Sequence, residues 1–244
     1  MRVSRQVKAV IMKVPGLPGY CHDPHSRAEI QEGDMTGLNM DVKRRELYEG
    51  YRREFENRLT QGQVNGFEAT FDYYVANFNR GWTLTSLPYV LATFYHETGR
   101  TMQPVREGFA KSNEEAVRIV TRMYEQGRIS INYAKPDPVT GLSYYGRGMI
   151  QTTWEDNYRK LGFVIFNDRE LLVNSPDLLL DLKISVETSI EGMKLGLFTG
   201  KRLSDYLTKE KKDYYNARRI VNGLDRASLI AGYAERFEKI IQLT

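Results

Sequence analysis

The sequence predicts a mainly α-helical protein. Apolar residues recur at intervals of three and four over several long segments, and capping residues precede many of these segments. With 244 residues, of which 41% are hydrophobic and 27% charged, the chain is long enough for one sizeable core. We expect a helical domain over residues 41–244, preceded by an extended arm over residues 1–40, which is rich in proline and glycine.

The first two helices are predicted from apolar stripes alone. Over residues 41–59, apolar side chains return at every third or fourth position, as on one face of a helix. Phe67, Phe71, Val75 and Phe78 repeat in the same way. We expect both stripes to belong to the core.

A third helix follows, with clearer boundaries. Thr85 or Ser86 is a suitable N-cap, and Pro88 is tolerated in the first turn, where backbone amides lack intrahelical partners. The apolar stripe runs to Phe94, and Glu97 lies three residues beyond it, near the C-terminal end. This carboxylate is therefore expected at the buried edge of the stripe.

A capping box predicts the next helix. Ser112 and Glu115 have the spacing of such a box, and Gly127 is suited to end the helix that it opens. Residues 128–143 hold several proline and glycine residues, so we expect an irregular segment there.

A second capping box, formed by Thr152 and Glu155, predicts a short helix that ends near Gly162. Further helices are expected at residues 184–197, around residues 203–207, after Asp213, and from a cap at Asp225 to the C-terminus.

Two segments gather side chains that suggest a site. Residues 95–100 (YHETGR) close the third helix. Residues 144–154 (YYGRGMIQTTW) are dense in glycine, aromatic and short polar residues, and they lead to Asn157 and Tyr158. Polar groups and a carboxylate crowded beside apolar surface are typical of a binding or catalytic site.

In this order the two segments resemble the family 19 glycoside hydrolases, which include chitinases and the lysozyme-like enzymes of bacteriophages and bacteria. Further matches at residues 175–178, 216–223 and 230–233 extend the resemblance over roughly residues 84–241. It implies a lysozyme-like α-helical fold with a catalytic cleft, to which residues 41–80 add helices. It also implies hydrolysis of β-1,4 bonds between amino sugars, with inversion.

The resemblance implies that Glu97 is the general acid. Such an acid must keep its proton near neutral pH, and burial beside apolar groups raises the pKa of a carboxyl because desolvation disfavours the charged form. The stripe of Leu91 and Phe94 offers such a surface. The alternative is an exposed carboxylate at the helix end, paired with Arg100.

The second carboxylate is predicted at Glu107, ten residues after Glu97. Glu114, Glu115 and Glu125 are rivals, although the first two suit a helix start. An inverting reaction requires the two carboxyl groups to lie about 6.5–9.5 Å apart, so that a water fits between the base and the sugar.

The resemblance also implies a set of substrate contacts. Thr153 is expected to hold the attacking water, while Gln151 and Asn157 bond the N-acetyl and hydroxyl groups of the sugar. Local capping is the alternative for Thr153 and Asn157. The other expected substrate-binding residues are His96, Tyr145, Arg147, Trp154 and Asn222.

Several of these residues have a specific expected role. Tyr145 and Trp154 are suited to stack on sugar rings, or else to pack in the core. Arg147, between two glycines, is suited to orient a carboxylate through a pair of hydrogen bonds. For Asn222 the alternative is a helix-end residue before Gly223.

One departure from the family is clear. The arginine that chitinases carry in the last helix aligns near Leu229 here. Arg218, Arg219 and Arg226 are the candidates to replace it, and the charge network around the acid must differ.

Composition and motifs exclude several other classes. Cys21 is the one cysteine, so no intrachain disulfide forms. No apolar run reaches the length of a membrane span, and residues 9–12 are too short for a secretory signal, which predicts synthesis in the cytoplasm. The zinc-protease pattern is broken at Arg100, and Cys21 with His22 and His25 lacks a fourth ligand, so we expect no metal and no cofactor.

A formal charge of +4 and a pI near 9.0 favour contact with an anionic polymer. We predict a monomeric peptidoglycan hydrolase, muramidase-like or endolysin-like, with no nucleic-acid partner. It would reach the cell wall or periplasm through a phage holin or inside a virion. The alternatives are a chitinase with the same fold and a non-catalytic wall-binding or virion structural protein.

Overall fold

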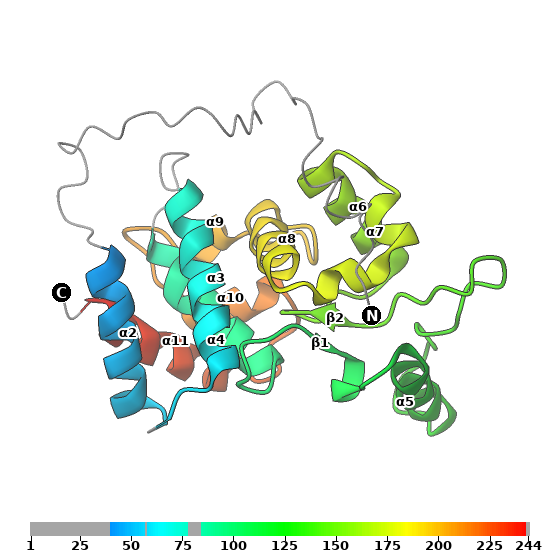
Figure 1. Cartoon of the computed structure of the whole chain (residues 1–244), viewed down its shortest axis with the longest axis horizontal. Helices are drawn as coiled ribbons and strands as arrows, with labels where there is room; N and C mark the ends of the chain where they lie inside the picture. Colours follow the sequence, from blue (N-terminus) through cyan, green and yellow to red (C-terminus); the bar gives the residue numbers. More distant parts are fainter. Residues whose placement is uncertain (1–39, 57, 78–83, 243–244) are drawn as a thin grey trace.

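The computed structural model describes residues 40–56, 58–77 and 84–242. Within these residues the protein is mainly α-helical, which confirms the predicted fold class (Figure 1). The predicted arm over residues 1–40 lies almost entirely outside the described residues, as does Phe78. In the described part of the chain, no helix is both long enough and apolar enough to cross a bilayer.

The larger part of the molecule is built from α2 (Met40–Glu54), α3 (Gln61–Asn77), α4 (Leu87–Glu97), α8 (Leu182–Leu195) and α11 (Ala227–Gln242). α11 packs against α4 and α2, and α3 packs against α8. Phe55, Tyr95 and Phe237 are in mutual ring contact between these helices. The helices assemble because each presents apolar side chains to this shared core.

The predicted stripes of α2 and α3 are found with two exceptions. α2 ends before Leu59, which nevertheless packs against the core. Val75 is 43% exposed, so its assignment to the core was wrong. Phe67, Phe71 and Tyr74 form the buried face of α3, and Val75 lies ~100° further around the helix from Tyr74.

α4 begins where the sequence predicts, after the short 3₁₀ turn η2 (Leu84–Ser86), and Pro88 lies in its first turn. Ser86 occupies the N-cap position without capping through its side chain. Its hydroxyl instead lies 2.9 Å from the Tyr74 hydroxyl, which ties α4 to α3. Glu97 is the last residue of the helix.

The smaller part contains α5 (Asn113–Glu125), α6 (Glu155–Phe166), α7 (Leu171–Asn174) and the 3₁₀ turn η4 (Pro176–Leu180). In Figure 1, α5 lies on one side of this part and α6 with α7 on the other, while β1 and β2 lie toward the larger part.

The strands form a two-stranded antiparallel sheet, which the sequence did not predict. β1 (Val105–Arg106) pairs with β2 (Arg147–Gly148), so that Arg106 lies opposite Arg147. Strands of two residues have too little periodicity to be recognised. The pairing brings the segment that follows α4 against the glycine-rich segment 144–154.

The start of α5 uses half of the predicted capping box. The Ser112 hydroxyl accepts a hydrogen bond from the Glu115 amide at 3.2 Å. The Glu115 carboxylate accepts from the Lys111 amide at 2.7 Å instead of returning to Ser112. Gly127, with a φ of 68°, follows the helix as predicted, and residues 128–143 are irregular.

Both ends of α6 differ from the prediction. Thr152 is not its cap, because it forms a backbone bridge with Arg147, and Trp154 takes the N-cap position without a side-chain bond. The helix also continues past Gly162. This glycine allows close packing instead, since a Cβ there would lie 2.6 Å from the Asp168 carbonyl oxygen.

Between α8 and α11 the chain forms α9 (Leu203–Tyr206), α10 (Tyr214–Ala217) and the 3₁₀ turn η5 (Arg218–Ile220). Asp213 caps α10 as predicted, because its carboxylate accepts from the Asn216 amide at 3.1 Å. The expected cap of α11, Asp225, offers its backbone carbonyl to Arg218 Nε at 3.1 Å.

The buried apolar residues form three clusters. The largest, which we call the main core, joins α2, α3, α4, α8 and α11. The second lies under α6 and α7. The third, which we call the α5 cluster, consists of Ala110, Ala116, Val120, Ala134 and Tyr145.

Candidate active site

Glu97, the predicted acid, faces a buried arginine. Its Oε1 accepts a hydrogen bond from Arg218 Nη1 in η5, and the two groups form an ion pair. The side chain of Arg218 is 3% exposed and that of Glu97 is 16% exposed. Of the three arginines considered from the sequence, the structure therefore pairs Arg218 with the candidate acid.

This pair changes the expected surroundings of Glu97. The prediction placed hydrocarbon around the carboxyl so that it keeps its proton. The apolar side chains of α4 are buried, but the carboxylate itself is paired with a guanidinium. The alternative pair with Arg100 is also wrong, because Arg100 pairs with Glu56 at 3.2 Å.

His96 lies half-buried beside this pair. Burial lowers the pKa of its imidazole by desolvating the charged form, and the attraction of Glu97 opposes this effect. The positive charges of Arg218 and Arg226 lower the pKa further. The ring is therefore neutral at pH 7 and has one donor and one acceptor nitrogen.

Glu107 opens the 3₁₀ turn η3 (Glu107–Phe109), directly after β1. Its backbone N–H donates to the Gly146 carbonyl at 2.8 Å, and its carboxylate accepts from the Gly146 N–H at 3.1 Å. A Cβ at position 146 would lie 2.5 Å from Glu107 Oε2 and 2.9 Å from Gln151 Oε1. The glycine is therefore required for this close contact.

Glu107 has the kind of environment that was predicted for Glu97. Burial raises the pKa of its carboxyl, and the negative charge of Glu97 raises it further. Hydrogen bonds from the Gly146 N–H and the Tyr133 hydroxyl oppose this rise without cancelling it. The two carboxylates thus lie within electrostatic reach of each other.

The rival carboxylates lie elsewhere. Glu114 and Glu115 are in the first turn of α5, and Glu115 accepts from the Lys111 amide there. Glu125 is exposed at the other end of the helix. Of the four candidates, Glu107 is the one that the structure bonds to the glycine-rich segment.

Gln151, Thr153 and Asn157 make bonds within or next to their own segment. Gln151 Nε2 donates to the Val105 carbonyl at 3.0 Å. Thr153 Oγ1 donates to the Gln151 carbonyl at 2.9 Å, and Asn157 Nδ2 donates to the Thr153 carbonyl at 2.8 Å. The local bonding considered for Thr153 and Asn157 is present, and their contacts with a sugar stay predictions.

Trp154 is 46% exposed and lies against Tyr133, with 5.6 Å between the ring centroids. The Tyr133 hydroxyl in turn lies close enough to Glu107 to lower the pKa of its carboxyl. The sequence analysis missed Tyr133 because it lies in the irregular segment 128–143, where no periodicity marks one residue above another.

Tyr145 and Arg147 are fully buried in this structure, and their contacts with a sugar stay predictions. The Arg147 guanidinium carbon lies 3.7 Å from the Tyr145 ring centroid. Arg147 does orient a carboxylate, but that of Asp177 in η4, to which its Nε donates at 2.8 Å.

Asn222 lies exposed after η5. Its backbone N–H donates to the Arg218 carbonyl at 3.0 Å, and its side-chain oxygen accepts from the Gly223 N–H at 2.8 Å. This is the helix-end arrangement that the sequence left open. A substrate contact at Asn222 stays a prediction.

Among the described residues, five of the seven non-glycine residues with positive φ lie in segment 144–154 or between the end of α4 and the end of η3. Arg100, Met102, Phe109, Gln151 and Trp154 have φ values between 54° and 74°. Such conformations cost a non-glycine residue of order 1–3 kcal/mol in the strained cases and recur at functional sites. Strain at these positions agrees with a functional role for both segments.

A cavity of about 680 Å³ lies between α5, segment 136–143 and η4. Arg147 and Asp177 line it, whereas neither Glu97 nor Glu107 does. It is therefore separate from the candidate carboxylates. Among the described residues, no group of three or more His, Cys, Asp or Glu side chains is arranged to hold a metal ion.

Comparisons with known proteins leave the family open. No protein-family model matches the sequence, and no curated protein matches it. Among solved structures, the crystal structure of a mutant of chitinase C is similar, with a TM-score of 0.45 and 18% sequence identity. The match covers 80% of this chain and 92% of the other. A likeness at this level does not establish a family, so the functional assignment depends on the site.

Proposed function

We propose that this protein is a glycoside hydrolase that cleaves β-1,4 bonds between amino sugars by general acid and base catalysis. The observation that carries the proposal is the pair formed by Glu97 and Glu107. Glu97 is ion-paired with Arg218, whereas burial raises the pKa of Glu107. Two nearby carboxyl groups in different surroundings are what this chemistry requires.

The surroundings of the pair support the same function. The β1–β2 pairing holds Glu107 against Gly146, so one carboxylate has a fixed position. The exposed indole of Trp154 offers a flat apolar face next to Tyr133, suited to the apolar face of a pyranose ring. We propose that the nearby Thr153 bonds the attacking water, and that Gln151 and Asn157 bond the sugar.

The resemblance assigns the acid to Glu97 and the base to Glu107, and we propose these roles. In the free protein Arg218 is ion-paired with Glu97, and burial raises the pKa of Glu107, so the proposed base starts in surroundings that favour its protonated form. The proposed roles require that, with the sugar bound, Glu97 carries the proton and Glu107 is ionised. Arg218 bonds Oε1 of Glu97, and we propose Oε2 as the oxygen that protonates the leaving group.

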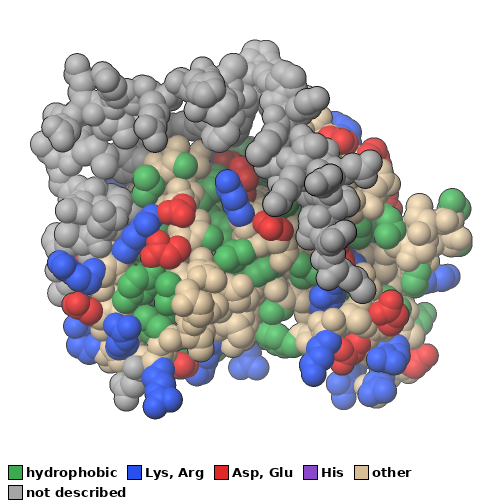
Figure 2. All heavy atoms as spheres, viewed as in Figure 1, with side chains coloured by type: hydrophobic (Ala, Val, Ile, Leu, Met, Phe, Trp, Pro, Cys, Tyr) green, Lys and Arg blue, Asp and Glu red, His purple; other side chains and the backbone are tan. Residues whose placement is uncertain are grey.

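We propose peptidoglycan rather than chitin as the substrate. The formal charge of +4 and the pI near 9.0 favour an anionic polymer. Figure 2 shows Lys and Arg side chains interspersed with Asp and Glu on one face, which provides a diffuse attraction rather than a single basic patch. In this proposal the protein is an endolysin or virion lysin that reaches the wall through a holin or with the particle.

Lysis assays test the proposal. Wild type is expected to reduce the turbidity of permeabilised Gram-negative cells, and Glu97→Gln to reduce it ~10²–10⁴-fold more slowly with unchanged folding. Mass spectrometry of purified sacculi identifies the bond cut from the amino sugar at the new reducing end. Equal rates for the two proteins would remove Glu97 from the mechanism. Binding to sacculi without product would identify a non-catalytic wall-binding protein, and cleavage of chitin oligomers alone a chitinase.

Aryl glycosides separate the roles of the two carboxylates. A good leaving group departs without protonation, so an acid variant keeps activity on such a substrate while a base variant does not. Azide replaces the activated water and restores a base variant. We expect the leaving group to rescue Glu97→Gln and azide to rescue Glu107→Gln, and the reverse pattern would exchange the roles.

A further inference from the structure

Tyr133 lies in an irregular segment, yet its backbone is fixed on both sides. Asn132 Nδ2 donates to the Thr121 hydroxyl of α5 at 3.1 Å. On the other side, the Ala134 carbonyl accepts from Ser143 Oγ at 2.6 Å, and Ala134 is fully buried. The residue between these two anchors therefore has a defined position.

The side chain of Tyr133 is held as well. Its ring packs against the α5 cluster on one side and against Trp154 on the other, at an interplanar angle of 58° to the indole. Its hydroxyl lies close enough to the Glu107 carboxylate to lower the pKa of that carboxyl by hydrogen bonding. Burial, with a smaller effect from the Glu107 charge, raises the pKa of Tyr133 to about 12, so the hydroxyl keeps its proton and acts as the donor.

The groups that face Glu107 come from several elements. The N–H of Gly146, the residue that precedes β2, donates to the carboxylate. The Tyr133 hydroxyl approaches the carboxylate from segment 128–143. Glu97, at the end of α4, acts on it as a negative charge, and the Gln151 amide oxygen lies beside Gly146. Of the two donors, Tyr133 is a side chain and is open to substitution.

We propose that Tyr133 is the positioning residue of Glu107: its hydroxyl donates to the carboxylate and holds it in one orientation, while Trp154 keeps the ring in place. The catalytic meaning of this inference rests on the proposed function, but its primary test does not. Without the hydroxyl, a partly buried carboxylate keeps its proton to higher pH, because a donor to its charged form is lost.

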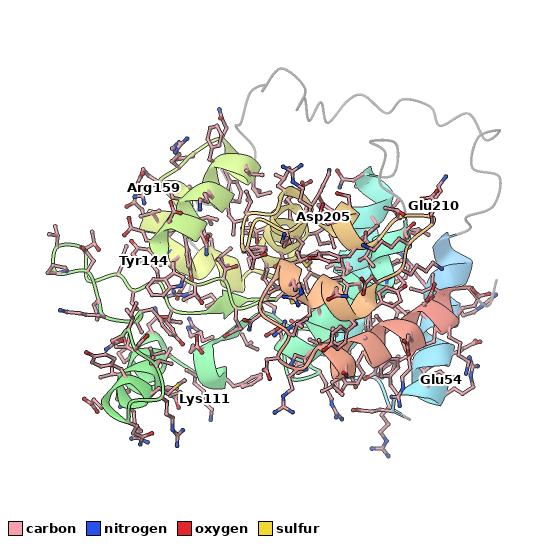
Figure 3. The ribbon with its side chains drawn as sticks, turned by 180° about the vertical axis from the view of Figure 1, so that it is seen from behind. Glu54, Lys111, Tyr144, Arg159, Asp205 and Glu210 are labelled. Atoms are coloured by element: carbon pink, nitrogen blue, oxygen red, sulfur yellow. The ribbon has the colours of Figure 1, made fainter. Side chains whose placement is uncertain are left out.

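Carbon-13 NMR of the Glu107 side-chain carboxyl tests the inference without an activity assay. Tyr133→Phe removes the hydroxyl and keeps the ring, and we expect the titration of Glu107 to move to higher pH. Tyr144→Phe is the matched control. Its hydroxyl donates to the Val173 carbonyl at 3.2 Å, and Figure 3 shows Tyr144 on the segment alongside α6, which carries Arg159.

The outcomes are distinct. A Glu107 titration that moves in Tyr133→Phe and coincides with wild type in Tyr144→Phe supports the inference. Coincident titrations of wild type and Tyr133→Phe overturn it. Trp154 adds a second check, since Trp154→Ala is expected to move the titration in the same direction and Trp154→Phe, which keeps an aromatic contact, to move it less.

Activity assays then link the inference to catalysis. If Glu107 is the base, the acid limb of the kcat/KM profile moves to higher pH in Tyr133→Phe, with little change in KM. A wild-type protein without hydrolysis, together with a moved Glu107 titration in Tyr133→Phe, would refute the proposed function and leave the inference standing. If wild type hydrolyses its substrate but Tyr133→Phe changes neither the Glu107 titration nor the acid limb of kcat/KM, the proposed function stands and the inference is refuted.

Discussion

The guanidinium of Arg218 and the carboxylate of Glu97 form a largely buried ion pair that joins η5 to the last residue of α4. Arg218 is also anchored by the Asp225 carbonyl, at 3.1 Å. Its position is therefore fixed from two sides, and the candidate acid is placed by a residue 121 positions away in sequence.

Removing this arginine should cost stability. Arg218→Met leaves a poorly hydrated carboxylate without its counter-charge, and loss of one partner of a buried pair costs about 3–5 kcal/mol. Arg219→Met, at an exposed neighbouring position, is the control and is expected to change stability little. Urea unfolding at pH 7 measures both, and equal free energies of unfolding would show that the pair contributes nothing.

Glu107→Gln should stabilise the protein at neutral pH. Burial raises the folded-state pKa of this carboxyl above its ordinary value of 4.5, so below that value both states are protonated and carry no penalty. As the pH rises through the folded-state pKa, the native protein must ionise a buried group and loses stability. Glutamine avoids this loss, so the gain should appear at pH 7 and vanish at low pH.

Glu114→Gln is the control for that experiment, with the opposite sign. A hydrogen bond with the Ser112 side chain lowers the pKa of this exposed carboxyl, so its contribution to stability is present at neutral pH and is lost on acidification. Unfolding curves across pH for the three proteins decide the matter. A Glu107→Gln protein that is less stable than wild type at pH 7 would contradict the assigned environment.

Gly146→Ala should reduce activity while the fold survives. A Cβ would lie 2.5 Å from Glu107 Oε2, which displaces the carboxylate from its hydrogen bond with the backbone. Gly232→Ala, where a Cβ meets nothing within 4 Å, is the matched control on α11. We expect about a hundredfold loss of kcat in the first variant, by comparison with misplacement of a catalytic group, and none in the second.

Asp177→Asn should flatten the acid limb of the stability profile. Burial alone would raise the Asp177 pKa, but the Arg147 and Arg106 guanidiniums and the Asn113 amide lower it on balance. Its contribution is therefore complete above the ordinary pKa and is lost as the pH falls through the lowered one. Circular dichroism during acid titration measures this.

The exposed Asp156, paired with Lys160 on α6, gives the control variant Asp156→Asn. Exposed pairs of this kind contribute little. An acid transition that is the same in Asp177→Asn and wild type would show that the network around Arg147 does not stabilise the fold.

The sequence predicted the helices well where a stripe and a cap coincide, as at α5 and α10. The prediction failed at Gly162, because the sequence does not distinguish a glycine that permits close packing from one that ends a helix. It also failed at Thr152, whose capping-box spacing occurs by chance in a segment that forms a backbone bridge. Local spacing does not distinguish these cases, since tertiary contacts decide them.

The site residues were also predicted where a local motif marks them and missed where only tertiary contacts do. Glu97 and Glu107 were identified by motif and distance along the chain, and the structure brings them within electrostatic reach. Arg218 was one of three candidates because nothing in its local pattern fixes the direction of its side chain. Tyr133 was missed altogether, since its contacts are with residues that are distant in sequence.

The anchoring of the two carboxylates has a mechanical consequence. Glu97 moves with α4 and the main core, whereas Glu107 is tied through Gly146 and Tyr133 to the α5 cluster. Met149 and Ile150, which follow β2, belong to the main core, so the segment that holds Glu107 is attached to the main core as well as to the α5 cluster. The packing of the fold therefore sets the gap between the two carboxyl groups, which must be about 6.5–9.5 Å to admit the water of an inverting reaction.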